Sequence, residues 1–315
     1  MSASVGRIVA LTGPGANPVD DVRRMLALHF MVNAFRAGAV VAVLGAVIGW
    51  YMVLRRQSFV GHTLAVVSFP GAAAALWLGV SVTAGYFAGS IVAALVIALV
   101  PRSPAGRAGS QESAVIGTVQ AFALATGALF VSLYGGFLDS VTGLLFGSFL
   151  GVSDGQVVAL AVVAVVVLAA MAVLGRPLFF ATVDRNVAVA RGVPERVLSV
   201  AFLLVLGCTA AEVSQITGAL LVFALLVMPA AAAQQLTARP VLGLALAVAL
   251  GLAVVWSALG VAFYSTWPVG FFVSTFGFAA YLAAMAVRLV RARTRRSAER
   301  EPGPAAVGAA GMVGA

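Results

Sequence analysis

Long apolar stretches alternate with short polar gaps along most of the chain, and this pattern predicts helices that cross a membrane. A bilayer core of about 30 Å needs about 20 apolar residues per helix. Apolar runs of this kind lie at 31–54, 62–80, 84–101, 113–133, 137–152, 156–175, 197–214, 216–235, 241–263 and 270–290. The fold class predicted from this pattern is all-α, a polytopic helical membrane protein.

The shortest run, 137–152, is predicted to enter the membrane and leave on the same side. Its spaced glycines Gly143, Gly147 and Gly151 are typical of a re-entrant segment or half-helix buried against protein. Arginines occupy the polar gaps at 55–56, 102–107, 176–196, 239 and 288–300. The positive-inside rule places such gaps in the cytoplasm, and all of them share one side only if 137–152 does not cross. We therefore predict about nine full spans plus this segment, with the amino end outside and the carboxyl end in the cytoplasm.

The pattern divides the chain into a membrane domain and two tails. Residues 1–29 are predicted to be an N-terminal tail, part of which mixes charged and apolar residues in a way that favours an amphipathic helix at the membrane interface. Residues 30–293 form the transmembrane domain. Residues 294–315 pass from arginines into a proline, glycine and alanine tract, which predicts a disordered cytosolic tail.

Composition narrows the possible functions. The chain has 315 residues, of which 62% are hydrophobic and only 9% charged, with a mean hydropathy of +1.10. Its 19 basic residues are all arginine, and the absence of lysine excludes a P-loop for nucleotide phosphates. Cys208 is the single cysteine, so no intrachain disulfide or multi-thiolate metal site can form.

The net charge of +9 does not indicate a nucleic-acid partner, because the arginines fall between apolar runs rather than on one basic face. No Ser/His/Asp constellation and no His-Glu-x-x-His motif stands out, so we do not expect an enzyme. We also expect no permanently bound cofactor.

Four separated motifs resemble those of the permease subunits of ABC importers for zinc, manganese and iron. They comprise Arg-Arg-Gln-Ser-Phe-Val-Gly-His with the following Phe-Pro-Gly at 55–71, Leu-Phe-Gly-Ser-Phe-Leu-Gly-Val at 145–152, the segment 182–193, and the tract 217–233. In this order and spacing, with the apolar pattern, the resemblance covers roughly residues 31–290. It implies that residues 30–293 form the transmembrane domain of an ABC importer in the plasma membrane of a prokaryote.

The resemblance also implies partners. A permease of this family works as a homodimer or a pair, with a separate cytosolic ATPase and an extracytoplasmic solute-binding protein that delivers the metal. The segment that holds Asp184, Ala188 and Gly192 resembles the part of the family that couples to the ATPase. The residues alone also allow a solvated loop whose arginines only set topology.

The second span departs from the family pattern. The family usually carries an aspartate there, followed four residues later by a histidine on the same helical face. This chain has His62 and Val66 at those positions. Facing His62 residues in a dimer would favour zinc over manganese, because zinc accepts imidazole. Pro70 cannot donate to the carbonyl of Val66, which makes that oxygen a second candidate ligand; a proline kink satisfied by packing is the alternative.

Glu212 is the other candidate metal ligand, since an ionisable group within a span usually faces a cavity or a partner. Cys208 and Gln215 lie on the same helical face, and solvation near the outer interface is the alternative. Pro229 is predicted to bend its helix by freeing a backbone carbonyl. Asp139 and Asp154 flank the re-entrant run and are expected to face outward.

The transported substrate predicted from these features is a divalent metal ion, with zinc or manganese favoured. A secondary transporter or channel driven by an ion gradient is the alternative, in which His62 and Glu212 would carry protons. A membrane scaffold or receptor component that has lost transport is a third hypothesis, because the aspartate and histidine pair is missing.

Overall fold

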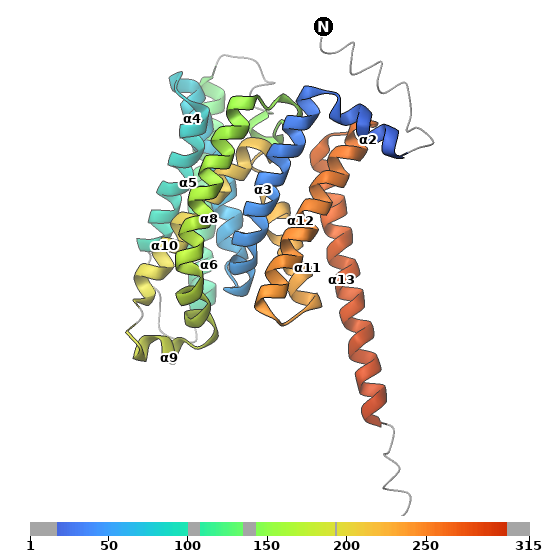
Figure 1. The fold of residues 1–315 in the computed structure, drawn as a ribbon. Helices are drawn as coiled ribbons and strands as arrows, with labels where there is room; N and C mark the ends of the chain where they lie inside the picture. Colours follow the sequence, from blue (N-terminus) through green and yellow to red (C-terminus); the bar gives the residue numbers. More distant parts are fainter. Residues whose placement is uncertain (1–17, 100–107, 135–142, 193, 301–315) are drawn as a thin grey trace, which may run out of the picture.

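The computed structural model describes residues 18–99, 108–134, 143–192 and 194–300 (Figure 1). In these ranges, 8 helices are long and apolar enough to cross a membrane. They are α3 (His29–Leu54), α4 (Ser58–Leu78), α5 (Val82–Leu99), α6 (Ala108–Leu133), α8 (Asp154–Val183), α10 (Glu195–Thr217), α12 (Pro240–Phe263) and α13 (Val269–Arg300). The shorter elements are α2 (Pro18–Leu26), η1 (Phe149–Gly151), α9 (Arg185–Ala190) and the apolar α11 (Val222–Leu236). The prediction of an all-helical polytopic membrane protein is confirmed.

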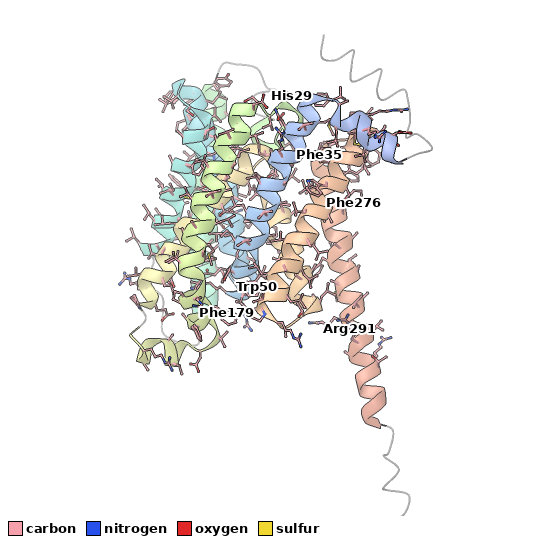
Figure 2. All side chains as sticks on the ribbon, in the orientation of Figure 1. His29, Phe35, Trp50, Phe179, Phe276 and Arg291 are labelled. Carbon is pink, nitrogen blue, oxygen red and sulfur yellow. The ribbon has the colours of Figure 1, made fainter. Side chains whose placement is uncertain are left out.

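The bundle has two ends, which we call the basic end and the far end. Trp50, Phe179 and Arg291 lie toward the basic end and His29 lies at the far end (Figure 2). At the basic end the guanidinium of Arg291 donates to the carbonyl of Leu236, at 3.3 Å. Helix α9 lies at this end as well (Figure 1). The arginine gaps in the described residues therefore share one end, as the sequence predicts, while the gap at 102–107 lies outside the described residues.

The segment between α6 and α8 starts and finishes at the far end. The end of α6 contacts the end of α4 through the rings of Phe130 and Trp77, whose centroids are 5.6 Å apart. The first residue of α8, Asp154, hydrogen-bonds His29 at the start of α3, at 2.9 Å. The prediction that run 137–152 does not cross is therefore confirmed, although residues 135–142 lie outside the described part.

The described part of this segment pairs with the chain between α10 and α11. Backbone N–H groups of Ala219 and Leu220 donate to the carbonyls of Leu144 and Leu145, each at 3.2 Å, and Ser148 donates to the carbonyl of Ile216. These bonds satisfy irregular backbone inside a bundle, where water is scarce. Glycines with left-handed φ angles allow the close approach, at Gly147 with φ 76 and Gly218 with φ 75.

Helix α11 is shorter than the span predicted at 216–235. It has 15 residues, which at 1.5 Å per residue is about 22 Å and less than the bilayer core. The chain leaves α10 after Thr217 and becomes helical again only at Val222. The span predicted at 216–235 is therefore this shorter apolar helix preceded by a non-helical turn, because residues 218–221 pair with the segment between α6 and α8 instead of extending a helix. Pro229 lies inside α11, as predicted.

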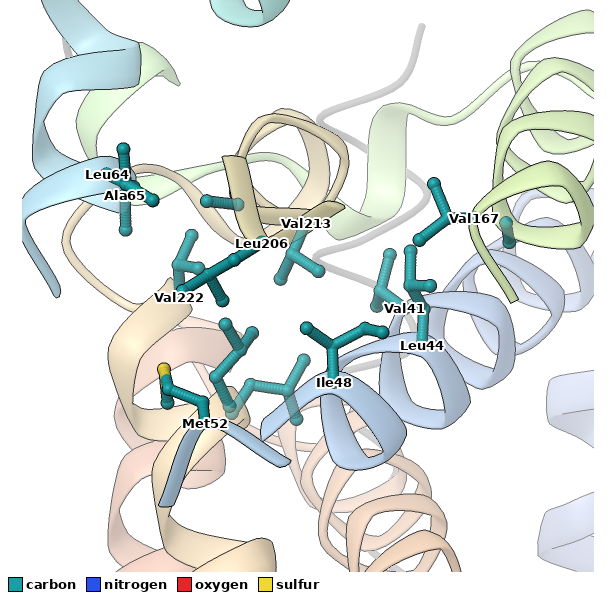
Figure 3. Close-up of a cluster of buried hydrophobic side chains, with 14 of the residues drawn as sticks. Val41, Leu44, Ile48, Met52, Leu64, Ala65, Val167, Leu206, Val213 and Val222 are labelled. Carbon is teal, nitrogen blue, oxygen red and sulfur yellow. The ribbon is translucent and has the colours of Figure 1, made fainter. Parts of the chain in front are cut away.

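Close helix packing is carried by glycines and by one large apolar cluster. A Cβ atom added to Gly89 of α5 would lie 2.9 Å from the carbonyl oxygen of Val67 in α4, so only glycine permits this crossing. Side chains of α3, α4, α8, α10 and α11 meet in the cluster shown in Figure 3. Among its buried members are Leu44, Ile48, Met52, Leu64, Val167, Leu206, Val213 and Val222.

The two ends of the described chain leave the bundle in different ways. Helix α2 lies across the far end (Figure 1), with Asp21 and Met25 buried while Val22 and Leu26 are exposed. Helix α13 has 32 residues, or about 48 Å of helix, and extends past the other helices at the basic end (Figure 1). The predicted tail begins at residue 294, but α13 continues to Arg300. Residues 1–17 and 301–315 lie outside the described part, so disorder beyond Arg300 stays a prediction.

Candidate functional site

His62 lies in the second turn of α4 and is half-buried. Its ring meets the ring of Phe223 at the start of α11 edge to face, with 5.0 Å between the centroids. The Nδ1 atom is buried and has no hydrogen-bond partner among the described residues. A neutral imidazole nitrogen of this kind is a common metal ligand. Zinc sites in proteins usually have four ligands, however, so one imidazole does not complete a site.

The described residues do not supply the missing ligands. No group of 3 or more His, Cys, Asp or Glu residues among them could hold a metal ion. No hydrogen bond or ion pair in this part of the chain joins His62 to Glu212, the other predicted ligand. His62 lies near the start of α4, whereas Glu212 lies near the end of α10, where Ser214 hydrogen-bonds Ser68 two turns further along α4. The two candidates therefore occupy different levels of the bundle, and a site at His62 needs ligands from another copy of the chain, a partner or water.

Pro70 lies inside α4, as the sequence predicts, and removes the N–H that would reach the carbonyl of Val66. A groove of about 600 Å³ runs beside Pro70 between α4, α5 and α6. Its lining is apolar except for Thr118 and Thr126, whose hydroxyls donate to carbonyls of their own helix at 2.9 and 2.8 Å. This groove therefore offers a cation no free side-chain ligand, and Val66 as a ligand stays a prediction.

Glu212 is buried in α10, with only 1% of its surface exposed. Its Oε2 atom accepts a hydrogen bond from Nε2 of Gln215 at 3.3 Å, and Oε1 of Gln215 accepts one from the hydroxyl of the exposed Thr83 at 2.9 Å. The Oε1 atom of Glu212 has no partner among the described residues. A chain of hydrogen bonds thus connects the surface of α5 to a buried carboxyl group. Because this carboxyl group is buried, contact with solvent near the outer interface does not account for an acid at this position in this conformation.

The change Glu212→Gln is expected to stabilise the metal-free protein by roughly 1 kcal/mol, because a buried group that can carry charge is replaced by a neutral amide of the same shape. Thermal unfolding in detergent measures this as a rise in Tm. The variant Gln215→Glu is the control, since it adds a second acid to the same face and is expected to lower Tm. A fall in Tm for Glu212→Gln would show that the carboxylate itself is required for folding.

Other residues singled out from the sequence have structural partners or lie outside the described part. Asp154 pairs with the exposed His29 at the far end, a contact that the sequence did not predict. Asp139 lies outside the described residues. Cys208 is a free, half-buried cysteine one helical turn before Glu212.

The predicted coupling residues lie together around α9. Asp184 ends α8, and its Oδ1 atom accepts a hydrogen bond from the backbone N–H of Val187 at 3.0 Å, which caps the start of α9. Ala188 is buried, and its N–H donates to the carbonyl of Asp184. Gly192 follows α9 with φ 76, where a residue with a side chain would be strained. The local sequence therefore builds a short, capped helix between α8 and α10.

A groove of about 550 Å³ lies where α8 meets α9. It is lined by Pro177, Phe180, Val183, Asp184, Val187, Ala188 and Arg191. Phe180 and Val183 are each 67% exposed, although both are large apolar residues. Exposed apolar side chains beside an arginine at one end of a membrane bundle are typical of a surface that binds another protein.

The sequence did not predict a set of side-chain contacts that lies near α9. Arg55, which the sequence indicated as a topology signal and as the first residue of the 55–71 motif, donates to the hydroxyl of Thr182 at 3.3 Å and to the hydroxyl of Ser199 at 3.1 Å. These partners flank α9 on both sides. Arg55 lies 127 positions before Thr182 and 144 positions before Ser199, so no local sequence pattern could have indicated these contacts.

Known proteins resemble this chain over most of its length. The manganese transport system membrane protein MntC of Halalkalibacterium halodurans is 27% identical over 228 residues, or 72% of this chain and 77% of that protein. The chelated iron transport system membrane protein YfeC of Yersinia pestis is 30% identical over 233 residues, or 74% of this chain and 76% of that protein.

A solved structure has a similar fold. A chain of PsaBC from Streptococcus pneumoniae in complex with Fab superposes with a TM-score of 0.75 at 20% identity, covering 84% of this chain and 94% of that chain. The profile of the ABC 3 transport family matches residues 27–288, from just before α3 into α13. Because this match spans most of the sequence and nearly the whole helical bundle, the chain belongs to the ABC 3 transport family and is a multi-pass membrane subunit of an ABC transporter.

Proposed function

We propose that this chain forms the membrane path of an ATP-driven importer for a divalent metal ion, with zinc or manganese as the transported substrate. The observation that carries the proposal is α9, a capped helix with an apolar groove beside it at the basic end of the bundle. A separate ATPase binding there would supply the energy, since this chain has no lysine for a P-loop.

The topology that supports this proposal follows from the arginines. The positive-inside rule makes the basic end cytoplasmic, so α9 and the C-terminus face the cytoplasm of a bacterial cell. The far end then faces the solute-binding protein that delivers the substrate. The paired side chains of His29 and Asp154 lie there, both exposed.

Two observations support a metal ion as the substrate. One is the imidazole of His62 beside Phe223, and the other is the relatives, whose names refer to manganese and to chelated iron. A second copy of this chain completes the site in the proposal, because one copy brings only a single imidazole to it among its described residues. Imidazole ligands favour zinc over manganese, which prefers oxygen.

The change His62→Ala is expected to lower metal-stimulated ATP hydrolysis by about tenfold or more in the complex with the ATPase, because a ligand of the transported ion is lost. The measurement uses reconstituted vesicles with zinc or manganese delivered by the binding protein. Thr118→Ala is the control, since its hydroxyl donates to a carbonyl of its own helix α6, and it should leave stimulation unchanged.

A second candidate function is a membrane subunit that carries no free cation, favoured by the lack of a three-ligand group in the described residues. The same experiment separates the two. If the binding protein stimulates ATP hydrolysis equally with and without zinc or manganese, the importer carries another solute. If no ATPase binds the basic end at all, both proposals are wrong.

A further inference from the structure

Arg55, the residue that follows α3, makes contacts with three other helices or their caps. Its Nη1 atom donates to the hydroxyl of Thr182 at 3.3 Å, and its Nη2 atom donates to the hydroxyl of Ser199 at 3.1 Å. Its Nε atom donates to Oε1 of Gln57 at 3.3 Å. The guanidinium also lies over the buried ring of Phe202, 5.4 Å from its centroid.

The three acceptors have positions that matter for the proposed function. Thr182 lies in the last turn of α8, just before α9, and Ser199 lies in the second turn of α10, just after it. Gln57 is the N-cap residue of α4, the helix that carries His62. One side chain therefore holds both sides of the α9 segment against the start of α4.

The chemistry of arginine suits this arrangement. Guanidinium is planar and has five N–H donors in a fixed fork, so it can hold several acceptors in one geometry. Lysine has one compact ammonium group on a flexible stem and cannot reproduce that fork. The hydroxyl of Thr182 in turn donates to the carbonyl of Leu178 at 2.7 Å, which fixes its orientation toward the arginine.

Arg56, the next residue, differs from Arg55 in its side-chain contacts. As a topology signal the two arginines are equivalent. Arg56 is exposed, and none of the hydrogen bonds that the structure shows for the described residues involves its side chain. Its backbone has φ 58, so the turn between α3 and α4 is tight at this residue. The two adjacent arginines thus provide a matched pair, one bonded across helices and one not.

We propose that Arg55 is a positioning residue that transmits movement of α9 to the start of α4. This rests on the proposed function, in which an ATPase moves α9. When α9 shifts, the ends of α8 and α10 shift with it, and the guanidinium carries that displacement to Gln57 and the first turn of α4. If the guanidinium contacts are lost, α9 moves but the first turn of α4 does not.

The test is a distance measured between spin labels in the complex with the ATPase. Labels on Phe59→Cys at the start of α4 and Val158→Cys near the start of α8 are accessible, because these side chains are 44% and 62% exposed. The background is Cys208→Ser, which removes the single native cysteine. This readout needs no transported substrate.

Addition of ATP and vanadate is expected to shift this distance in the parent protein and in Arg56→Gln. The shift is expected to be lost in Arg55→Gln and reduced in Arg55→Lys, while each variant still binds the ATPase. In zinc-uptake vesicles, Arg55→Gln is expected to lower uptake per ATP hydrolysed by about tenfold, because hydrolysis is no longer coupled to movement of α4. A purely stabilising residue would instead lower uptake and hydrolysis in proportion.

An unchanged ATP-dependent shift in Arg55→Gln would overturn the relay and leave the proposed function intact. Failure of the parent protein to bind an ATPase would overturn the proposed function itself. If Arg55→Gln does not fold, the double variant Thr182→Val with Ser199→Ala replaces it, since it removes two acceptors and keeps the arginine. A full shift in that double variant would equally overturn the relay.

Discussion

Replacing Gly49 with alanine is expected to prevent the bundle from assembling correctly. Gly49 lies where α3 crosses the backbone of Leu226 in α11, and an added Cβ would lie 2.8 Å from the carbonyl carbon and 3.2 Å from the Cα atom of Leu226. Backbone atoms cannot rotate away as a side chain can, so the two helices must separate. Overpacked cores lose about 1 to 3 kcal/mol when side chains can adjust, and we expect a larger loss here.

The measurement for Gly49→Ala is size-exclusion chromatography and thermal unfolding in detergent, in which the monodisperse peak is lost or Tm falls sharply. Gly117→Ala is the matched control, because Gly117 lies in α6 and a Cβ there meets nothing within 4 Å. Alanine in an open helical position stabilises by about 1 kcal/mol relative to glycine. Equal Tm values for the two variants would show that the α3–α11 contact does not limit stability.

The change Gly192→Arg is expected to lower the affinity of this chain for its ATPase by about tenfold, equivalent to about 1.4 kcal/mol, without unfolding the bundle. Gly192 ends the α9 segment with φ 76, and a residue with a side chain costs about 1 to 2 kcal/mol in that conformation. A Cβ there meets no atom within 4 Å, so the effect comes from the backbone and from added bulk on the docking surface.

Binding of the purified ATPase to the reconstituted chain measures this effect. Gly155→Arg is the matched control, since Gly155 lies in the first turn of α8 at the far end and its Cβ position is equally open. Gly155→Arg should leave ATPase binding unchanged. If Gly192→Arg binds the ATPase as the parent does, α9 is not the docking segment.

Hydropathy predicted where the helices lie because each run is a long apolar stretch, and the arginine gaps predicted that run 137–152 does not cross. The same signal could not predict the break at 218–221. That segment is as apolar as its flanks, and its conformation depends on hydrogen bonds to Leu144 and Leu145, more than 70 residues earlier in the chain.

The candidate site shows the same division between local and distant causes. Glu212 and His62 could be found from the sequence because an ionisable residue in an apolar run is conspicuous. Arg55 could not, because an arginine at a helix end is expected in any membrane protein. Its role depends on Thr182 and Ser199, which only the fold brings beside it.

The length of α13 restricts what can approach the chain from the cytoplasm. About 18 Å of its 48 Å remains once the bilayer core is crossed, so the helix projects beyond the membrane at the basic end, on the side of the bundle away from α9 (Figure 1). A soluble protein that docks at α9 and spreads across the basic end must therefore leave room for this helix. An ATPase of that width needs a recess or an edge at the position of α13.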